Sequence, residues 1–221
     1  MIGRNHATVG AVVALGFSPL ISDDPVTILL VATTAAGAAV LPDIDHPNAS
    51  VSKVIPIAGP LLSRFVALVA GGHRNRTHTL EAGTLVTTAA LFASQHRLAA
   101  ACVIATLVCF AAALLGPHLR LVSAASLAEF VIAIIVGLAV FRLNWLPVDW
   151  LPAAVAIGYV SHLFTDAITT AGIKPILIAP KFRLRLTRIR TGGFTEGLLG
   201  TVAILALIAL TYVRIAQPFL G

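Results

Sequence analysis

Long apolar runs, separated by short polar stretches, extend along the chain from Ala7 to Ile215. Seven runs are long enough to predict membrane-crossing segments, at 7–21, 26–41, 79–94, 98–115, 121–141, 151–171 and 195–215. The first three are short for a complete hydrocarbon core. Continuous apolar runs favour helices, because strands of a membrane β-barrel alternate apolar and polar residues. The sequence therefore predicts an all-α, polytopic membrane helical bundle that forms a single integral membrane domain over residues 1–221.

The stretch 54–70 is apolar but differs from the seven predicted spans. It contains Pro56, Pro60, Ser63 and Arg64, and Lys53 precedes it. These residues favour an interfacial or re-entrant segment over a crossing helix. With seven crossings, the polar stretches 42–78, 116–120 and 172–194 all return to the side that holds the N-terminus. The C-terminus is then expected on the opposite side.

Basic residues test this assignment, because they collect on the cytoplasmic side of bacterial membrane proteins. Only three of the 15 basic residues fall on the C-terminal side, namely Arg97, Arg142 and Arg214. The others share the side of the N-terminus: Arg4, Lys53, Arg64, Arg74, Arg76, Arg120, Lys174, Lys181, Arg183, Arg185, Arg188 and Arg190. We therefore expect a multi-pass protein of the bacterial inner membrane, with a cytoplasmic N-terminus and a periplasmic C-terminus.

Composition agrees with a membrane domain and excludes other classes. The 221 residues are 58% hydrophobic and 11% charged, and the mean hydropathy is +0.96. A net charge of +6 would suggest nucleic-acid binding in a soluble protein, but here it is explained by cytoplasmic loops, so we expect no nucleic-acid partner. Cys102 and Cys109 share one apolar segment without a CxxC motif, which indicates neither a disulfide nor a metal site. The apolar run after Arg4 lacks a cleavage site and is interpreted as a retained first helix.

Four groups of metal-ligand residue types stand out against this apolar background, and the predicted topology assigns all four to the cytoplasmic side. The groups are His6; Asp43, Asp45 and His46 in LPDIDHP; His73 and His78 in GHRNRTHTL; and His162 and Asp166 in SHLFTD. The loop charges and the hydropathy fix the topology without reference to these residues. Their expected meeting at one face is therefore independent support for a shared site.

Imidazole and carboxylate groups bind divalent Zn²⁺, Mn²⁺ or Fe²⁺, and a carboxylate can bridge two ions. His162 and Asp166 are four residues apart, so they share one helix face. We predict a centre of one to three divalent ions, with Zn²⁺ as the first choice. A bound ion that activates water makes hydrolysis the expected chemistry, and Asp45 or Asp166 can orient that water. Arg74 and Arg76 are candidate substrate-binding residues, because guanidinium groups bind phosphate.

Structural explanations exist for individual members of this set. His6 alone can be a solvated residue at a helix end, and Asp43 or Asp45 alone can end a helix. Ionisable groups within an apolar segment, such as His162 and Asp166, are costly and usually functional. Glu81 either stabilises a helix start or supports a ligand, and Glu129 lies within a predicted span without an assigned role.

At these residues the sequence resembles the YdjM-type family of bacterial membrane-bound metal-dependent hydrolases, some members of which are described as LexA-regulated. The resemblance rests on motifs in a fixed order: His6, LPDIDHP at 41–47, GHR at 72–74, THTL at 77–80, GYVSHLFTD at 158–166, TTAGI at 169–173 and TGGFTE at 191–196. Asn75-Arg76 stands where the family has Gly and an aromatic residue, and Thr170 stands where Pro is usual.

The resemblance implies a helical inner-membrane protein with a hydrolase-type metal site. It assigns metal-binding roles to the four groups above and makes Glu196 a second-tier candidate beside Glu81. A looser likeness to zinc-dependent phospholipase C, which also uses an HxxxD pair on one helix, suggests a phosphoester. The sequence thus predicts a metal-dependent phosphoesterase that acts on a membrane lipid or another anionic, lipid-like substrate. A metal-ion transporter and a membrane scaffold with a structural metal remain alternatives.

Overall fold

The computed structural model describes residues 1–55, 57–118, 127–179 and 181–217, and within them the chain is helical with no strand. The all-α prediction is confirmed. Two isolated bridges, Thr169 with Ile189 and Ile173 with Leu184, fold the loop after α7 onto itself. The α-helices are α1 (Gly3–Phe17), α2 (Pro25–Ala38), α3 (Ala58–Ala70), α4 (Leu80–Ser94), α5 (Arg97–His118), α6 (Leu127–Arg142), α7 (Leu151–Ala167) and α8 (Phe194–Thr211).

Local sequence signals set several helix ends. Asp24 caps α2, since its carboxylate accepts a hydrogen bond from Thr27 N at 2.7 Å, and Pro25 occupies the first turn. Thr79 caps α4 in the same way through Ala82 N. α7 ends at Ala167 rather than at the predicted residue 171, and the chain turns through Gly172 in the left-handed region.

Helix α2 is the centre of the bundle and packs against α1, α5 and α7. Its contacts with two of these helices depend on glycine. A Cβ on Gly37 would lie 1.9 Å from the Leu107 carbonyl oxygen of α5, and one on Gly158 of α7 would lie 2.2 Å from that of Ala35. Small residues allow such close approach between membrane helices. Gly158 also lies one turn before His162, so this contact brings His162 to the C-terminal end of α2.

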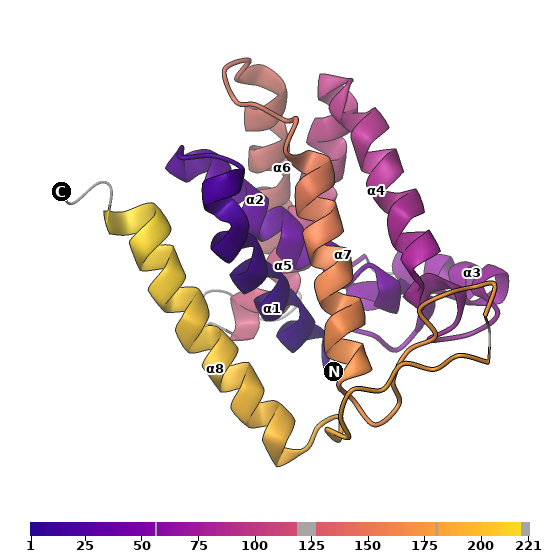
Figure 1. Cartoon of the computed structure of the whole chain (residues 1–221). Helices are drawn as coiled ribbons and strands as arrows, with labels where there is room; N and C mark the ends of the chain where they lie inside the picture. The colour runs from indigo at the N-terminus through magenta and orange to yellow at the C-terminus, as the bar shows by residue number, and fades with distance from the viewer. Residues whose placement is uncertain (56, 119–126, 180, 218–221) are drawn as a thin grey trace.

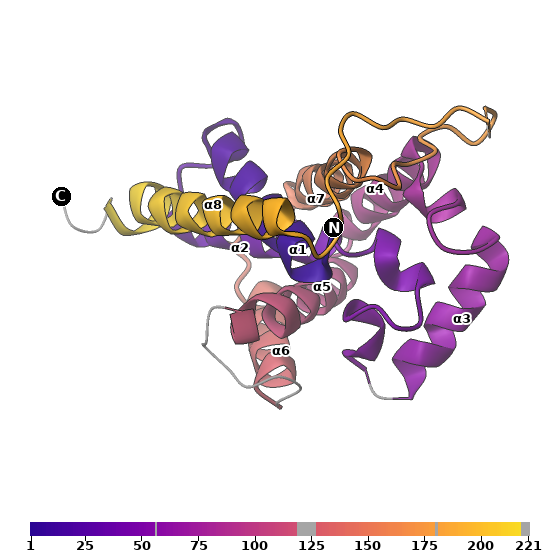
Figure 2. The same ribbon diagram turned by 90° about the horizontal axis from the view of Figure 1, so that it is seen from below.

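The helix directions bring several distant segments to one end of the bundle, which we call the site end (Figure 1). The N-terminus, the C-terminal end of α7 and the start of α8 lie there, and α8 runs to the opposite end. Helix α3 lies across the site end instead of along the bundle, as the view from below shows (Figure 2). The interfacial or re-entrant placement of the stretch 54–70 stays a prediction, and Pro56 in this stretch lies outside the described residues.

The predicted number of seven transmembrane helices is not confirmed. Three helical segments of the described chain are long and apolar enough to cross a membrane: Pro25–Asp45, Arg97–Gly116 and Phe194–Ala216. α1 and α4 have 15 residues each, α6 has 16 and α7 has 17. At 1.5 Å per residue these are shorter than a hydrocarbon core of roughly 30 Å. Arg120 and residues 121–126 of one predicted span lie outside the described residues.

Candidate metal centre

Four separate segments deliver the predicted ligand residues to the site end. A short 3₁₀ turn after α2 (Pro42–Asp45) carries Asp43 and Asp45, and a second one before α4 (Arg76–His78) carries His78. The last turns of α7 carry His162 and Asp166, and the first turn of α1 carries His6. The predicted meeting of the four groups is therefore what the structure shows.

His78 and His162 form the buried middle of the cluster. Their Nε2 atoms lie 3.2 Å apart, and both side chains are fully buried. Nδ1 of His162 lies 2.7 Å from the Ala39 carbonyl oxygen, which can only accept a hydrogen bond, so Nδ1 carries the proton. Nε2 of His162 therefore presents a lone pair toward His78. Backbone contacts of this kind orient metal-binding histidines.

Two carboxylates border the same point. Oδ1 of Asp43 lies 3.6 Å from His78 Nε2 and 3.8 Å from His162 Nε2. Oδ2 of Asp166 lies 3.6 Å and 3.7 Å from these same nitrogens. This Oδ2 is buried and accepts no hydrogen bond from any group in the described part of the chain. A buried acceptor without a donor is costly, and a bound cation would satisfy it.

Three overlapping triads of potential ligands result, and in each the donor atoms lie within 4.8 Å of one another. The triads are His6, Asp43 and His162; Asp43, His73 and His78; and His78, His162 and Asp166. Nitrogen and oxygen donors in this number suit Zn²⁺, Mn²⁺ or Fe²⁺. The site can therefore hold a metal ion.

Asp45 has a different environment from Asp43. It is buried, accepts a hydrogen bond from His73 Nδ1 at 2.7 Å and from Arg74 N at 3.3 Å, and is also bonded to the Thr77 hydroxyl. Through these contacts Asp45, which follows the end of α2, holds in place the loop that carries His73 and His78. Burial lowers the pKa of His78, but Asp43 and Asp45 raise it by more, so its pKa lies above the ordinary value of 6.5.

Arg74 enters the cluster through an unusual backbone conformation. Its φ is 57°, in the left-handed region that non-glycine residues rarely adopt. Its NH2 donates to Asp166 Oδ1 at 2.8 Å and its NH1 to Thr169 Oγ1 at 3.3 Å. The amino group of Met1 also contacts this Oδ1, at 2.7 Å. The other predicted substrate-binding residue, Arg76, lies outside the cluster and donates to Val69 O at 3.3 Å.

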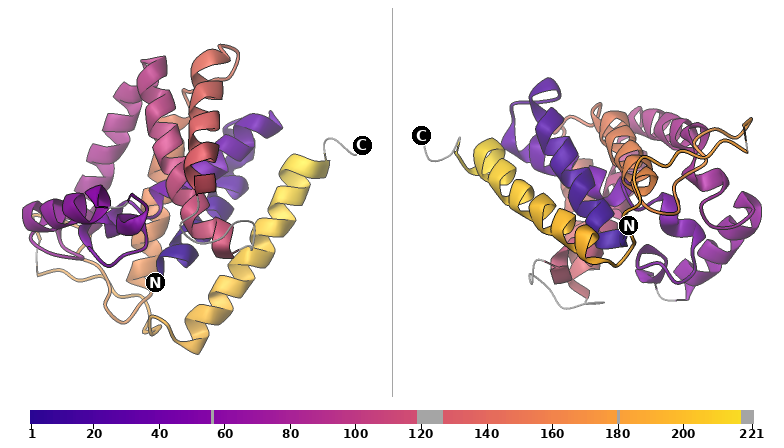
Figure 3. Two further views of the ribbon diagram at one scale, coloured as in Figure 1. Left: turned by 180° about the vertical axis from the view of Figure 1, so that it is seen from behind. Right: turned by 60° about the horizontal axis from the view of Figure 1, so that its bottom comes forward.

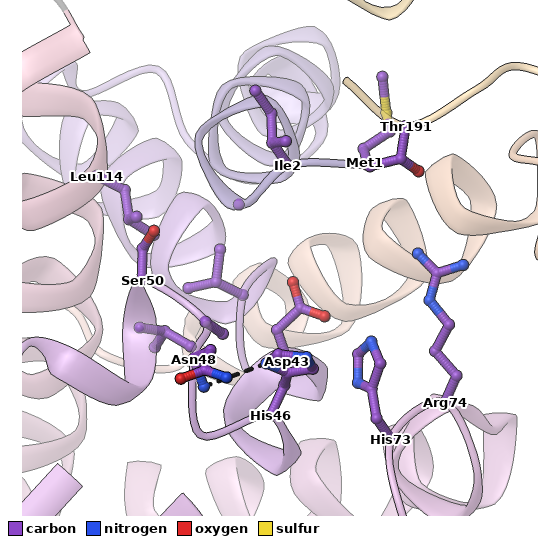
Figure 4. Close-up of a pocket in the computed structure, with 14 residues that line it drawn as sticks. Met1, Ile2, Asp43, His46, Asn48, Ser50, His73, Arg74, Leu114 and Thr191 are labelled. Atoms are coloured by element: carbon purple, nitrogen blue, oxygen red, sulfur yellow. Dashed lines mark hydrogen bonds between the residues drawn. The ribbon is translucent and has the colours of Figure 1, made fainter. Parts of the chain in front are cut away.

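A polar cavity of about 290 Å³ opens beside the cluster. Figure 4 shows the Asp43 carboxylate, the His73 ring and the Arg74 guanidinium directed into the same space. His46, Asn48, Ser50 and Thr191 also line the cavity. Through Asp43 and His73 the cavity gives access to the cluster.

Of the remaining candidates, His6 belongs to one triad, whereas His46, Glu81 and Glu196 belong to none. His6 stacks on His162 with ring centroids 3.9 Å apart, and its Nδ1 contacts Thr165 Oγ1 at 2.7 Å. His46 packs edge-on against His73. The second-tier candidates Glu81 and Glu196 are held by other contacts. Glu81 accepts from Leu177 N, and the buried Glu196 accepts from Ile2 N, Asn5 Nδ2 and Gly192 N, so it joins α8 to the start of α1.

The site also contains polar groups that the sequence interpretation did not select. The Thr77 hydroxyl donates a hydrogen bond to Asp45, and the Thr165 hydroxyl is hydrogen-bonded to His6. The Tyr159 hydroxyl donates a hydrogen bond to the Thr77 carbonyl oxygen. In the sequence Thr77 directly precedes His78 and Thr165 directly precedes Asp166. This adjacency to candidate ligands is the sequence signal that could have identified them. The carbonyl of Ala39 has no sequence signal, because any residue supplies one.

Comparison with known proteins identifies a family for the chain. The model of a family described as the YdjM inner membrane protein family matches residues 1–121. That region includes His6, the turn with Asp43 and Asp45, and the turn with His78. No curated protein and no solved structure matches the chain. Because the family model covers more than half of the 221 residues, the chain belongs to the YdjM inner membrane protein family.

Proposed function

We propose that this protein is a metal-dependent hydrolase that cleaves a phosphoester at the cytoplasmic face of the inner membrane. One observation carries the proposal: a buried cluster of imidazoles and carboxylates, with an orphaned Asp166 oxygen, borders a polar cavity that also receives an arginine. Structural metal sites are closed, whereas catalytic sites keep an open position for water or substrate.

In this proposal His78, His162 and Asp166 hold the metal, and a coordination position stays open on the side of Asp43 and the cavity. A bound divalent ion supplies a more acidic water and a Lewis acid for the scissile oxygen. Asp43 is the carboxylate that both faces the histidines and lines the cavity, so it is best positioned to accept the proton of an attacking water. Asp45 holds His73 and the backbone of Arg74 in place. The shared position of Asp43 in two triads also suits a centre with two ions.

Arg74 is proposed to bind the phosphoryl group. Its guanidinium contacts Asp166 at the boundary between the cluster and the cavity. Metal binding by Asp166 would reduce the negative charge available to Arg74 and leave the guanidinium free for an anionic substrate. The likeness to zinc-dependent phospholipase C, confined to the pair His162 and Asp166, supports the same substrate class by analogy.

Two alternatives predict different arrangements. A metal-ion transporter has its ligands near the middle of the membrane on broken helices, whereas this cluster lies at helix ends on one end of the bundle. A scaffold with a structural metal has no need of an open polar cavity beside the ligands.

The test is hydrolysis by purified full-length protein. In detergent and in liposomes, the protein should cleave a soluble aryl phosphodiester when Zn²⁺, Mn²⁺ or Fe²⁺ is supplied, and chelation should stop the reaction. Metal uptake into proteoliposomes without hydrolysis of any phosphoester would support the transporter instead. Bound metal with neither activity would support the scaffold.

A further inference from the structure

An apolar groove of about 340 Å³ lies between α4, α5 and α7, apart from the polar cavity. Its lining includes Leu41, Val86, Ala90, Cys102, Thr106 and Val155. Thr106 is the only hydroxyl among these side chains, and its Oγ1 donates to Cys102 O at 2.8 Å within α5. The groove therefore offers no charged group and no free hydroxyl donor to an occupant.

The groove lining shares two elements with the metal cluster, the end of α2 and helix α7. Leu41 lies two residues before Asp43. Val155 lies seven residues before His162 on α7, which places the two on one helix face about 10 Å apart along the axis. On the facing wall, Val86 follows His78 by eight residues. The polar cavity is lined by cluster residues, and the groove lining comes within two residues of Asp43 and within two helical turns of His162.

Helix geometry explains why this groove exists. α4 ends at Ser94 and α5 begins at Arg97, so a tight turn joins them at the end opposite the cluster. From this turn the two helices diverge toward the site end (Figure 3). Alanines on α4 and the exposed Cys102 and Thr106 on α5 leave the space between them unfilled. α5 contains one of the candidate membrane spans, so the open side of the groove is within reach of lipid.

From this arrangement we infer that the groove holds one linear hydrocarbon chain of the substrate, and that the substrate is a phosphate-bearing lipid. The inference rests on the proposed function and narrows its substrate class. An amphiphile whose phosphate lies beside Arg74 and the ligand cluster can extend its tail along α4, α5 and α7. Apolar contact is the only interaction that the groove side chains provide, so they recognise the tail and leave the headgroup to the polar cavity.

Photocrosslinking tests where the tail lies. The probe is a long-chain alkyl phosphonate with a diazirine near the chain end, added to Zn²⁺-loaded, full-length protein in detergent. We expect crosslinks on Val86 to Ala90, Cys102 to Leu107 or Val155, and excess unlabelled long-chain phosphonate should remove them. Cys102→Trp fills the groove and should abolish these crosslinks while bound metal stays at the wild-type level. Leu205→Trp, at an exposed site on α8, is the matched control and should crosslink as the wild type does.

The possible results separate this inference from the proposed function. Competable crosslinks on other helices, or equal labelling of Cys102→Trp and wild type, would overturn the groove assignment. Absence of any competable crosslink would overturn it as well. Hydrolysis of the soluble aryl phosphodiester, which has no long chain, is measured on the same preparations and reports on the proposed function alone.

Discussion

The Nε2 atoms of His78 and His162 lie 3.2 Å apart, although 84 positions separate these residues in the chain. Two imidazole lone pairs repel each other at this distance unless a proton or a metal ion lies between them. Asp43 and Asp166 each direct an oxygen toward the same point. The two carboxylates supply negative charge that favours a cation, and this contact is the core of the candidate centre.

Loss of single ligands should remove metal before it affects folding. We expect His162→Ala and Asp166→Asn each to weaken metal binding by more than the roughly 10–100-fold loss typical of residues that only support a ligand. Both variants should still insert, because removing an ionisable group lowers the cost of insertion. Metal content of purified protein measures the effect. His96→Ala, at an exposed position at the opposite end, is the control.

Arg74 and Arg76 provide a matched pair. Arg74→Gln should raise KM for the aryl phosphodiester roughly 10–100-fold, since a charge-assisted hydrogen bond contributes about 1.5–3 kcal/mol. Arg76→Gln should change KM little, because its guanidinium lies outside the cluster on the Val69 carbonyl. Equal effects of the two substitutions would show that the loop acts through its net charge and that Arg74 has no specific contact with substrate.

The raised pKa of His78 has opposite consequences for the metal-free and the metal-bound protein. In the metal-free protein, the interaction of protonated His78 with Asp43 and Asp45 contributes its full stability below the unfolded-state pKa of about 6.5. That contribution is lost as pH rises through the higher folded-state pKa. Metal has to displace the same proton, so apparent metal affinity should rise with pH over this range.

Thermal unfolding of chelated protein at a series of pH values measures the first effect, and metal titration at the same pH values measures the second. The chelated His78→Gln variant should not show this loss of stability as pH rises. A metal affinity that is constant from acidic to alkaline pH would contradict the participation of His78.

Topology can be tested at both ends of the chain. The N-terminus should be cytoplasmic and the C-terminus periplasmic, because basic residues concentrate on the side of the N-terminus and α8 ends away from it. Reporter fusions at the two termini measure this directly. Two termini on one side would mean that the number of crossings is even, and the short helices α1 and α4 would be the first to re-examine.

Hydropathy predicted the helices because nearly all of them are continuous apolar runs, but it did not predict their ends. α1 starts at Gly3, before the predicted residue 7, because Asn5 and His6 are buried by other helices. Such burial of polar residues depends on tertiary contacts that a hydropathy window does not include. The end of α7 likewise depends on the turn that follows it, whereas α8 continues as a π-helix to Ala216, close to the predicted end at 215.

Residue types and helix periodicity predicted which side chains the structure brings together, but not how their contacts differ. Asp43 and Asp45 share one short motif. Only the geometry of the 3₁₀ turn places the Asp43 carboxylate in the cavity lining and the Asp45 carboxylate against His73. Arg74 and Arg76 likewise contact different partners because of the backbone conformation. The left-handed φ of Arg74 directs it to Asp166, and a non-glycine residue carries no sequence signal for that conformation.

The most direct test is a count of metal ions and hydrolytic rate in the same samples. Wild-type protein is chelated, reloaded with increasing Zn²⁺ and compared with the double variant His78→Ala/His162→Ala. We expect the wild-type rate of phosphodiester hydrolysis to rise in proportion to bound metal, and the double variant to have neither metal nor activity. Wild-type metal content in the double variant, or full hydrolysis by chelated protein, would contradict this expectation.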